Sequence, residues 1–187
     1  MKVYFDNAAT TPLHPDVIKD ISQQMAINFG NPSSSHQFGR HAKNLVESAR
    51  KSIAKNLKCA PNEIIFTAGG SEADNLILRN AVENLGVKRI ISSTVEHHAV
   101  LHMIDALKAD YDTEVCNVNL TENGAVDLTY LESLLKDTTQ KTLVSLMYIN
   151  NEIANLLPLK TVADLCKTYD AYFHSDTVQA IAHYDIN

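Results

Sequence analysis

The sequence of 187 residues contains no tryptophan and only three cysteines, and these shortages exclude several classes of protein. Cys59, Cys116 and Cys166 are odd in number and widely spaced, which fits neither a disulfide framework nor the spacing of metal ligands. No apolar run is long enough to cross a bilayer, and the N-terminal residues lack the hydrophobic stretch of a signal peptide. We therefore expect a cytoplasmic protein that has no metal site and does not span a membrane.

Positive charge is also scarce. The formal net charge is -6 and the pI is about 5.7, and no cluster of lysine and arginine occurs along the chain. Such a balance argues against nucleic acid or an anionic membrane as the main partner. Hydrophobic residues make up 45% of the chain, which is enough to build the core of one domain.

The pattern of apolar residues changes once along the chain. Helical spacing dominates residues 14–29 and 40–57, with a Gly/Ser-rich loop between them. From Glu63 onward, short β-rich apolar runs alternate with helical segments, which is typical of a mostly parallel sheet covered by helices on both faces. The predicted strands are 63–68, 88–94, 113–119, 142–149 and 171–176, and the predicted helices are 72–86, 98–110, 127–137 and 159–170.

Two glycines and a serine follow the first predicted strand, in "FTAGGSEADN" (66–75). Gly69 and Gly70 let the backbone approach a ligand closely, and the start of the next helix offers free N–H groups and a Ser71 hydroxyl. A phosphate group suits such a turn. The alternative interpretation is an ordinary tight turn in which Ser71 caps the helix.

An acidic residue follows the last predicted strand, in "FHSDTVQ" (173–179). An ionised Asp176 at the end of a buried strand is costly unless a positive group neutralises it. A protonated heterocyclic nitrogen would do so, and Gln179 could reach a ring oxygen from the same side. Alternatively, Asp176 caps the next helix and Gln179 is solvated.

Histidines and asparagines follow two further strands. In "VEHHAV" (95–100), one imidazole could stack on an aromatic ring and exchange protons, whereas His98 is better read as a surface or capping residue. In "INNEI" (149–153), two amides could bind a polar ligand or simply form a turn. Because all four motifs follow successive strands, we expect them at the same edge of the sheet.

Six motifs in order resemble the N-terminal half of the cysteine desulfurases, in the NifS/IscS-like branch of the class V aminotransferase family. They are "YFDNAATTP", "GNPSSSHQFGR", "FTAGGSEADN", "VEHHAV", "NNEI" and "FHSDTVQ", and the resemblance covers essentially all 187 residues. The resemblance implies the fold-type I architecture of enzymes that use pyridoxal 5'-phosphate (PLP). It also implies that residues 1–15 are an N-terminal segment and that 16–187 are the N-terminal part of the PLP-binding large domain.

The resemblance assigns six residues to the cofactor: Gly70, Ser71, His97, Asn151, Asp176 and Gln179. The first two would bind the phosphate, and Asn151 would contact the ring oxygen and the region of the substrate carboxylate. Asp176 would pair with the pyridine nitrogen, and Gln179 would bond the phenolic oxygen. His97 would stack on the ring and is the predicted catalytic residue, since it could also move protons.

Two positions depart from the family pattern. The family more often has Ala-Thr where this chain has Gly70-Ser71, although serine keeps the hydroxyl. The glycine that often follows "NNEI" is Ala154 here, which we expect to be a minor change.

The resemblance implies an intact enzyme that converts L-cysteine to L-alanine and passes sulfur, as a persulfide, to a sulfur acceptor or an iron–sulfur scaffold protein. Such enzymes are homodimers. Their Schiff-base lysine and nucleophilic cysteine would lie beyond Asn187, so we expect the chain alone to be inactive. Another enzyme of the class V group, such as a selenocysteine lyase, and an inactive PLP-fold binding module remain the alternatives.

Overall fold

The computed structural model describes residues 1–184 and divides the chain into two compact units. The larger unit combines Met1–Thr10 with Thr67–Tyr184, and the smaller unit contains Thr11–Phe66. This division falls at different residues from the predicted segments 1–15 and 16–187. Whether 16–187 forms part of one cofactor-binding domain in the intact protein stays a prediction.

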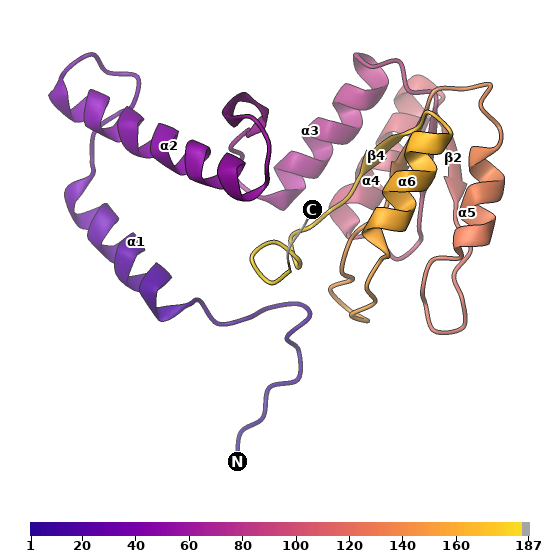
Figure 1. The fold of residues 1–187 in the computed structure, drawn as a ribbon, viewed down its shortest axis with the longest axis horizontal. Helices are drawn as coiled ribbons and strands as arrows, with labels where there is room; N and C mark the ends of the chain where they lie inside the picture. Colours follow the sequence, from indigo (N-terminus) through magenta and orange to yellow (C-terminus); the bar gives the residue numbers. More distant parts are fainter. Residues whose placement is uncertain (185–187) are drawn as a thin grey trace. The chain divides into compact units, whose positions relative to one another are not determined.

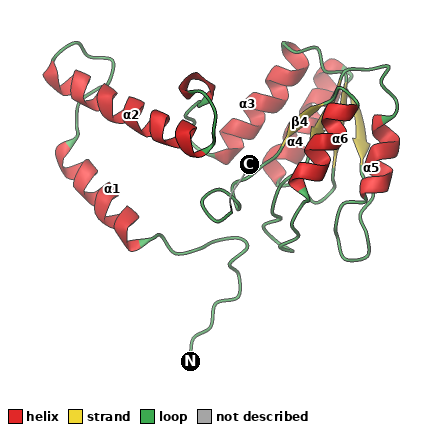
Figure 2. Ribbon diagram, in the orientation of Figure 1, coloured by secondary structure: helices red, strands yellow, loops and turns green. Residues whose placement is uncertain are grey.

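The larger unit is built on a parallel sheet of four strands (Figures 1 and 2). The strands lie in the order β2-β1-β3-β4, and every neighbouring pair is parallel. Each connection between successive strands contains a helix, as parallel pairing requires. The strands are β1 (Arg89–Ser92), β2 (Glu114–Asn117), β3 (Thr142–Ser145) and β4 (Tyr172–His174), and the helices are α3 (Gly70–Glu83), α4 (His98–Tyr111), α5 (Leu128–Leu135) and α6 (Leu159–Thr168).

Alternation of side chains along the two central strands gives the sheet two apolar faces. Ile90 and Leu143 pack in one core cluster with residues of α3 and α4. Their neighbours Ile91 and Val144 pack in a second cluster with residues of α5 and α6. The sheet is therefore covered by helices on both faces, which confirms the predicted α/β fold class.

The smaller unit contains α1 (Pro15–Ile27), α2 (Gln37–Asn56) and a short 3-10 helix, η1 (Pro61–Glu63). The prediction of a strand at 63–68 is wrong, since residues 64–68 have no regular secondary structure. A strand is stabilised by a partner's backbone, but here the Ile64 carbonyl accepts a hydrogen bond from the Arg50 guanidinium. The same guanidinium lies over the Phe66 ring, 4.7 Å from its centroid. Side-chain contacts thus take the place of strand pairing.

Among residues 1–184, no helix has both the length and the apolar character that crossing a bilayer requires.

Replacing Ile91 by alanine should destabilise the larger unit strongly. This side chain lies on the central strand β1 and is fully buried in the core. We expect the free energy of unfolding to fall by about 2–5 kcal/mol, measured by urea denaturation. Ile77→Ala is the matched control, since Ile77 is 44% exposed on α3. Equal losses for the two variants would contradict the assignment of Ile91 to the core.

Candidate functional site

A cavity of about 250 Å³ lies where chain segments leave the carboxyl ends of the strands. We call it the strand-end cavity. All six residues that the sequence predicted as ligand contacts line it: Gly70, Ser71, His97, Asn151, Asp176 and Gln179. Four further residues complete the lining: Ala9, Asp74, Met147 and Val178. The fold therefore gathers residues that are up to 170 positions apart in the sequence, Ala9 and Gln179, around one space.

Helix α3 begins at the cavity with Gly70, so Gly69 is its N-cap residue and makes no side-chain capping bond. Ser71 lies inside the first turn, so the alternative interpretation of Ser71 as the helix cap is wrong. The first N–H groups of a helix have no partner within the helix and carry positive partial charge. A β-carbon on Gly70 would lie 2.6 Å from Val178 Cγ2, so the absence of a side chain there keeps the cavity open.

The two acidic residues after Ser71 do not compete with an anion for these N–H groups. Glu72 turns back, and its Oε2 accepts a hydrogen bond from the backbone N–H of Ala68 at 2.6 Å. Asp74 is buried and lies against His174, with Oδ1 3.3 Å from Nε2. The start of α3 is therefore free to receive a negatively charged group.

His97 has two roles at the start of α4. It is the N-cap residue, and its Nδ1 accepts a hydrogen bond from the backbone N–H of Ala99 at 3.1 Å. In the neutral imidazole the proton is then on Nε2, the nitrogen that is not engaged by the helix. His98 does not line the cavity and instead stacks on His102, with ring centroids 5.4 Å apart. Of the two adjacent histidines, only His97 lines the cavity.

The two asparagines of the β3–α6 connection differ in role. Asn150 is buried, and its side chain holds the turn, since Oδ1 accepts from the backbone N–H groups of Glu152 and Ile153. Asn151 lines the cavity. Ala154 closes the turn with a φ of +59°, a left-handed conformation that favours glycine. The departure from the family's glycine at this position is therefore a source of strain rather than a neutral change.

Asp176 is half-buried beside β4, and its position is fixed by backbone contacts. Its carbonyl accepts from Tyr148 N–H at 2.8 Å, and its Oδ1 accepts from Val178 N–H at 2.9 Å. Burial raises the pKa of the Asp176 carboxyl above its usual value, and the nearby Asp74 adds to the rise. Within residues 1–184, no lysine or arginine forms an ion pair with Asp176.

Gln179 contacts the N-terminal segment of the same unit. Its Nε2 donates a hydrogen bond to the Ala9 carbonyl at 3.0 Å. A carboxamide nitrogen carries two protons, so one N–H remains for a ligand in the cavity. The contact also explains why a residue near the N-terminus lines this site.

Sequence reasoning missed a buried pair, of which Asp74 lines the cavity and His174 does not. Asp74 and His174 are each more than nine-tenths buried, and His174 also contacts Ser145, with Nδ1 2.9 Å from Oγ. Asp74 follows Gly70 by one helical turn and so lies on the same face of the helix, and this spacing could have indicated that Asp74 is near the cavity. Its partner could not be inferred, because His174 is 100 residues away.

Sequence reasoning also missed Glu96, the residue before His97. Its side chain is buried, Oε1 accepts from the Ser93 hydroxyl at 2.7 Å, and Oε2 accepts from Met147 N–H at 2.8 Å. Burial raises the pKa of Glu96 to about 7, against the two hydrogen bonds that lower it, and Asp176 and Asp74 contribute to the rise. Three carboxyl groups thus share one poorly solvated region.

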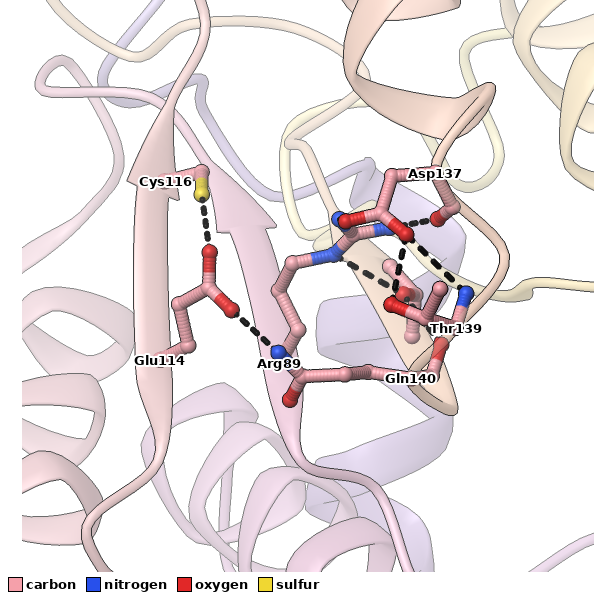
Figure 3. Close-up of polar contacts among 7 residues, drawn as sticks. Arg89, Glu114, Cys116, Asp137, Thr139 and Gln140 are labelled. Carbon is pink, nitrogen blue, oxygen red and sulfur yellow. Dashed lines mark hydrogen bonds and ion pairs between the residues drawn. The ribbon is translucent and has the colours of Figure 1, made fainter.

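Charged residues at and beside the amino ends of the strands are already engaged in polar contacts, both with one another and with neutral side chains (Figure 3). The Arg89 guanidinium donates to Thr142 Oγ1 at 3.0 Å and to Asp137 Oδ2 at 3.2 Å. Glu114 accepts from Gln140 and from the Cys116 thiol. These groups therefore have polar partners within the protein, unlike Asp176 at the opposite edge, which has no lysine or arginine partner among residues 1–184.

None of the three cysteines lines the strand-end cavity. Cys166 is buried in the core, and burial raises the pKa of its thiol to about 12. Burial also raises the pKa of the Cys116 thiol. Neither is therefore a ready nucleophile. Within residues 1–184, no group of three or more His, Cys, Asp or Glu residues is arranged to hold a metal ion.

Comparison with known proteins gives consistent similarities. A sequence profile described as "Aminotransferase class-V" matches residues 3–187. The chain is 40% identical over 182 residues to the "Putative cysteine desulfurase IscS 1" of Bacillus subtilis strain 168, and this alignment covers 96% of the chain and 47% of that relative. The chain spans about half the length of the curated relatives it matches.

Two solved structures share its fold over nearly the whole chain. A NifS-like protein from Rickettsia africae ESF-5 gives a TM-score of 0.82 at 35% identity, covering 97% of this chain and 49% of that one. A structure described as "SspA in complex with cysteine" gives a TM-score of 0.87 at 29% identity, covering 98% and 53%.

Replacing Ala154 by glycine should stabilise the Asn150–Ala154 turn. A left-handed conformation costs a non-glycine residue about 1–2 kcal/mol, and the greater freedom of glycine in the unfolded chain offsets part of the gain. We expect a net rise of up to about 1 kcal/mol in the free energy of unfolding, measured by urea denaturation. A loss of stability would show that the turn does not carry this strain.

Stability should depend on pH through Glu96. Because the folded-state pKa of about 7 lies above the ordinary value of 4.5, the folded chain binds the proton more tightly than the unfolded chain. The contribution is therefore fully present below pH 4.5 and is lost as the pH rises through about 7, with a maximum change of about 3 kcal/mol. Urea denaturation between pH 4.5 and 7.5 measures this change.

Glu96→Gln should remove this part of the pH dependence, because the amide does not titrate. Glu122→Gln, which alters an exposed glutamate, is the control and should keep it. Identical pH profiles for wild type and Glu96→Gln would rule out titration of Glu96 in this range.

Proposed function

Because the chain belongs to the aminotransferase class-V family, we propose that the strand-end cavity binds PLP and serves a cysteine desulfurase. One observation carries the proposal: the cavity combines the open start of α3 with the half-buried carboxylate of Asp176, which has no lysine or arginine partner in the described chain. A ligand with a phosphate group and a protonated ring nitrogen satisfies both features.

The residues present fit this cofactor chemically. Burial is the main cause of the raised pKa values of Asp176 and Glu96, and a cationic ring nitrogen beside Asp176 would favour its ionised form. At the start of α3, free N–H groups and the Ser71 hydroxyl suit a phosphate. No side chain at Gly70 obstructs the approach, and Glu72 is engaged elsewhere. Bound PLP supplies an electron sink for negative charge that develops at the substrate α-carbon.

Each of the six predicted residues has a role in the proposal. Gly70 and Ser71 bind the phosphate, and Asp176 holds a proton on the ring nitrogen by charge pairing. Gln179 donates its second amide N–H to the phenolic oxygen, since the first is donated to Ala9. Asn151 binds beside the ring oxygen and orients the substrate carboxylate.

His97 is the proposed catalytic residue of this part of the chain. Its Nδ1 is held by the α4 backbone, so stacking on the ring and any proton exchange use the ring face and Nε2. A residue fixed by its own helix also loses little conformational freedom on binding a ligand.

We extend the proposal to the intact protein. It converts L-cysteine to L-alanine and passes the sulfur, through a persulfide, to an acceptor such as an iron–sulfur scaffold protein. It acts in the cytoplasm as a homodimer. The cysteine named in the description of one structural neighbour supports the choice of substrate. Within residues 1–184 no lysine or cysteine lines the cavity, so the proposal assigns neither the cofactor-linking nor the sulfur-accepting role to them.

The cofactor assignment predicts that the chain binds PLP and that Asp176→Asn weakens binding at least about tenfold, because one partner of a partly buried charge pair is lost. Ser71→Ala should weaken binding less, since it removes one neutral donor. Asp105→Asn, at an exposed position on α4, is the matched control. Isothermal titration calorimetry at fixed pH measures all four affinities. Equal affinities for wild type and Asp176→Asn would contradict the assignment.

The activity is tested on the intact protein by measuring the release of alanine and sulfur from L-cysteine and, in parallel, the release of alanine and selenium from L-selenocysteine. Alanine from L-cysteine supports a desulfurase. Alanine from L-selenocysteine alone would identify a lyase of the selenium amino acid. PLP binding without turnover of either substrate would identify a binding module.

A further inference from the structure

The buried carboxyl group of Glu96 connects two segments that line the strand-end cavity. We propose that Glu96 is a positioning residue: it holds the turn that carries His97 against the end of β3, and thereby sets the placement of His97 relative to Met147 and Asn151. The inference rests on the proposed function, because it concerns the same cavity.

Two hydrogen bonds place the Glu96 carboxyl between these segments. Oε1 accepts from the Ser93 hydroxyl at 2.7 Å, within the turn that follows β1. Oε2 accepts from the backbone N–H of Met147 at 2.8 Å, beyond the end of β3. Glu96 is only 6% exposed, so water does not readily replace either contact. Since His97 is the next residue, a shift of Glu96 moves the catalytic candidate directly.

A second hydrogen bond between the two segments runs in the opposite direction. Asn150 Nδ2 donates to the Val95 carbonyl at 2.7 Å, while its Oδ1 holds the backbone of the following turn. Asn151, which lines the cavity, therefore lies beside a residue that is bonded to the His97 turn. Glu96 and Asn150 thus connect the turn that carries His97 to the segment after β3, and both of these segments line the cavity.

A glutamate is an unusual choice for this connection, because its charge is poorly accommodated. The charged groups that act on it are Asp176 after β4 and Asp74 on α3, while His174 on β4 and His97 act in turn on Asp176. Both aspartates oppose ionisation of Glu96. A glutamine would also accept the Met147 N–H without charge, although more weakly than an ionised carboxylate does. The acid therefore adds a charge to the cavity that the connection itself does not need.

Protonation changes the charge of Glu96 without breaking the connection. An ionised carboxylate accepts from both Ser93 and Met147. A protonated carboxyl can donate to Ser93 Oγ instead, because a hydroxyl group can reverse its role, and still accept from Met147. Glutamine reproduces this neutral arrangement, whereas alanine removes both contacts and leaves the Met147 N–H unsatisfied.

The first test follows the Met147 backbone amide by NMR during a pH titration of the chain without any cofactor. In wild type and in the Glu122→Gln control, the Met147 resonance should shift with a midpoint near 7, the pKa of the carboxyl that it contacts. In Glu96→Gln this transition should disappear. A Met147 resonance that titrates identically in wild type and Glu96→Gln would overturn the proposal.

The second test compares positioning with simple structural support. At pH 7, Glu96→Ala should bind PLP at least tenfold more weakly than wild type, while Glu96→Gln should stay within about threefold. In the same samples, His97 ring resonances should match wild type in Glu96→Gln and differ in Glu96→Ala. Unchanged His97 resonances in a folded Glu96→Ala would overturn the proposal.

The two tests separate this inference from the proposed function. If the wild-type chain does not bind PLP, the cofactor assignment fails, but the Met147 titration and the His97 resonances still decide the role of Glu96. If Glu96→Ala does not fold, the Met147 titration of Glu96→Gln decides it alone.

Discussion

The chain's candidate site depends on a carboxylate that the protein does not neutralise by itself. Asp176 is half-buried, its pKa is raised by burial, and residues 1–184 provide no lysine or arginine as a partner. The neighbouring Asp74 adds to the rise in the pKa of Asp176. Charge of this kind is costly in a protein interior, so a site that keeps it is suited to a cationic ligand group.

The fold produces this arrangement because all four strands run in the same direction. Their carboxyl ends meet at one edge, where the start of α3, the His97 turn and the segment after β4 come together. At the opposite edge, the Arg89 guanidinium donates hydrogen bonds to Asp137 and Thr142. The polar groups at the amino ends are hydrogen-bonded to one another, whereas Asp176 at the carboxyl ends has no lysine or arginine partner among the described residues. This contrast distinguishes a structural polar cluster from a candidate ligand site.

Sequence patterns predicted the features that depend on local order along the chain. The alternation of strands and helices, the resemblance to the class V group and the convergence of six residues are all found. The predicted strand at 63–68 is wrong, because Arg50 binds the backbone that a partner strand would need. Asp74 and Glu96 were missed because their contacts join positions 100 and 51 residues apart, which no local pattern reveals. The roles of the six residues towards PLP stay predictions.

The central claim is that a cationic ring nitrogen neutralises Asp176. The most direct test is to measure the pKa of its carboxyl group, from the NMR shift of the carboxyl carbon during a pH titration, with and without PLP. The account predicts a pKa above the ordinary aspartate value in the free chain and a fall well below that value when PLP is bound. A carboxyl group whose pKa does not change when PLP saturates the cavity would contradict the account.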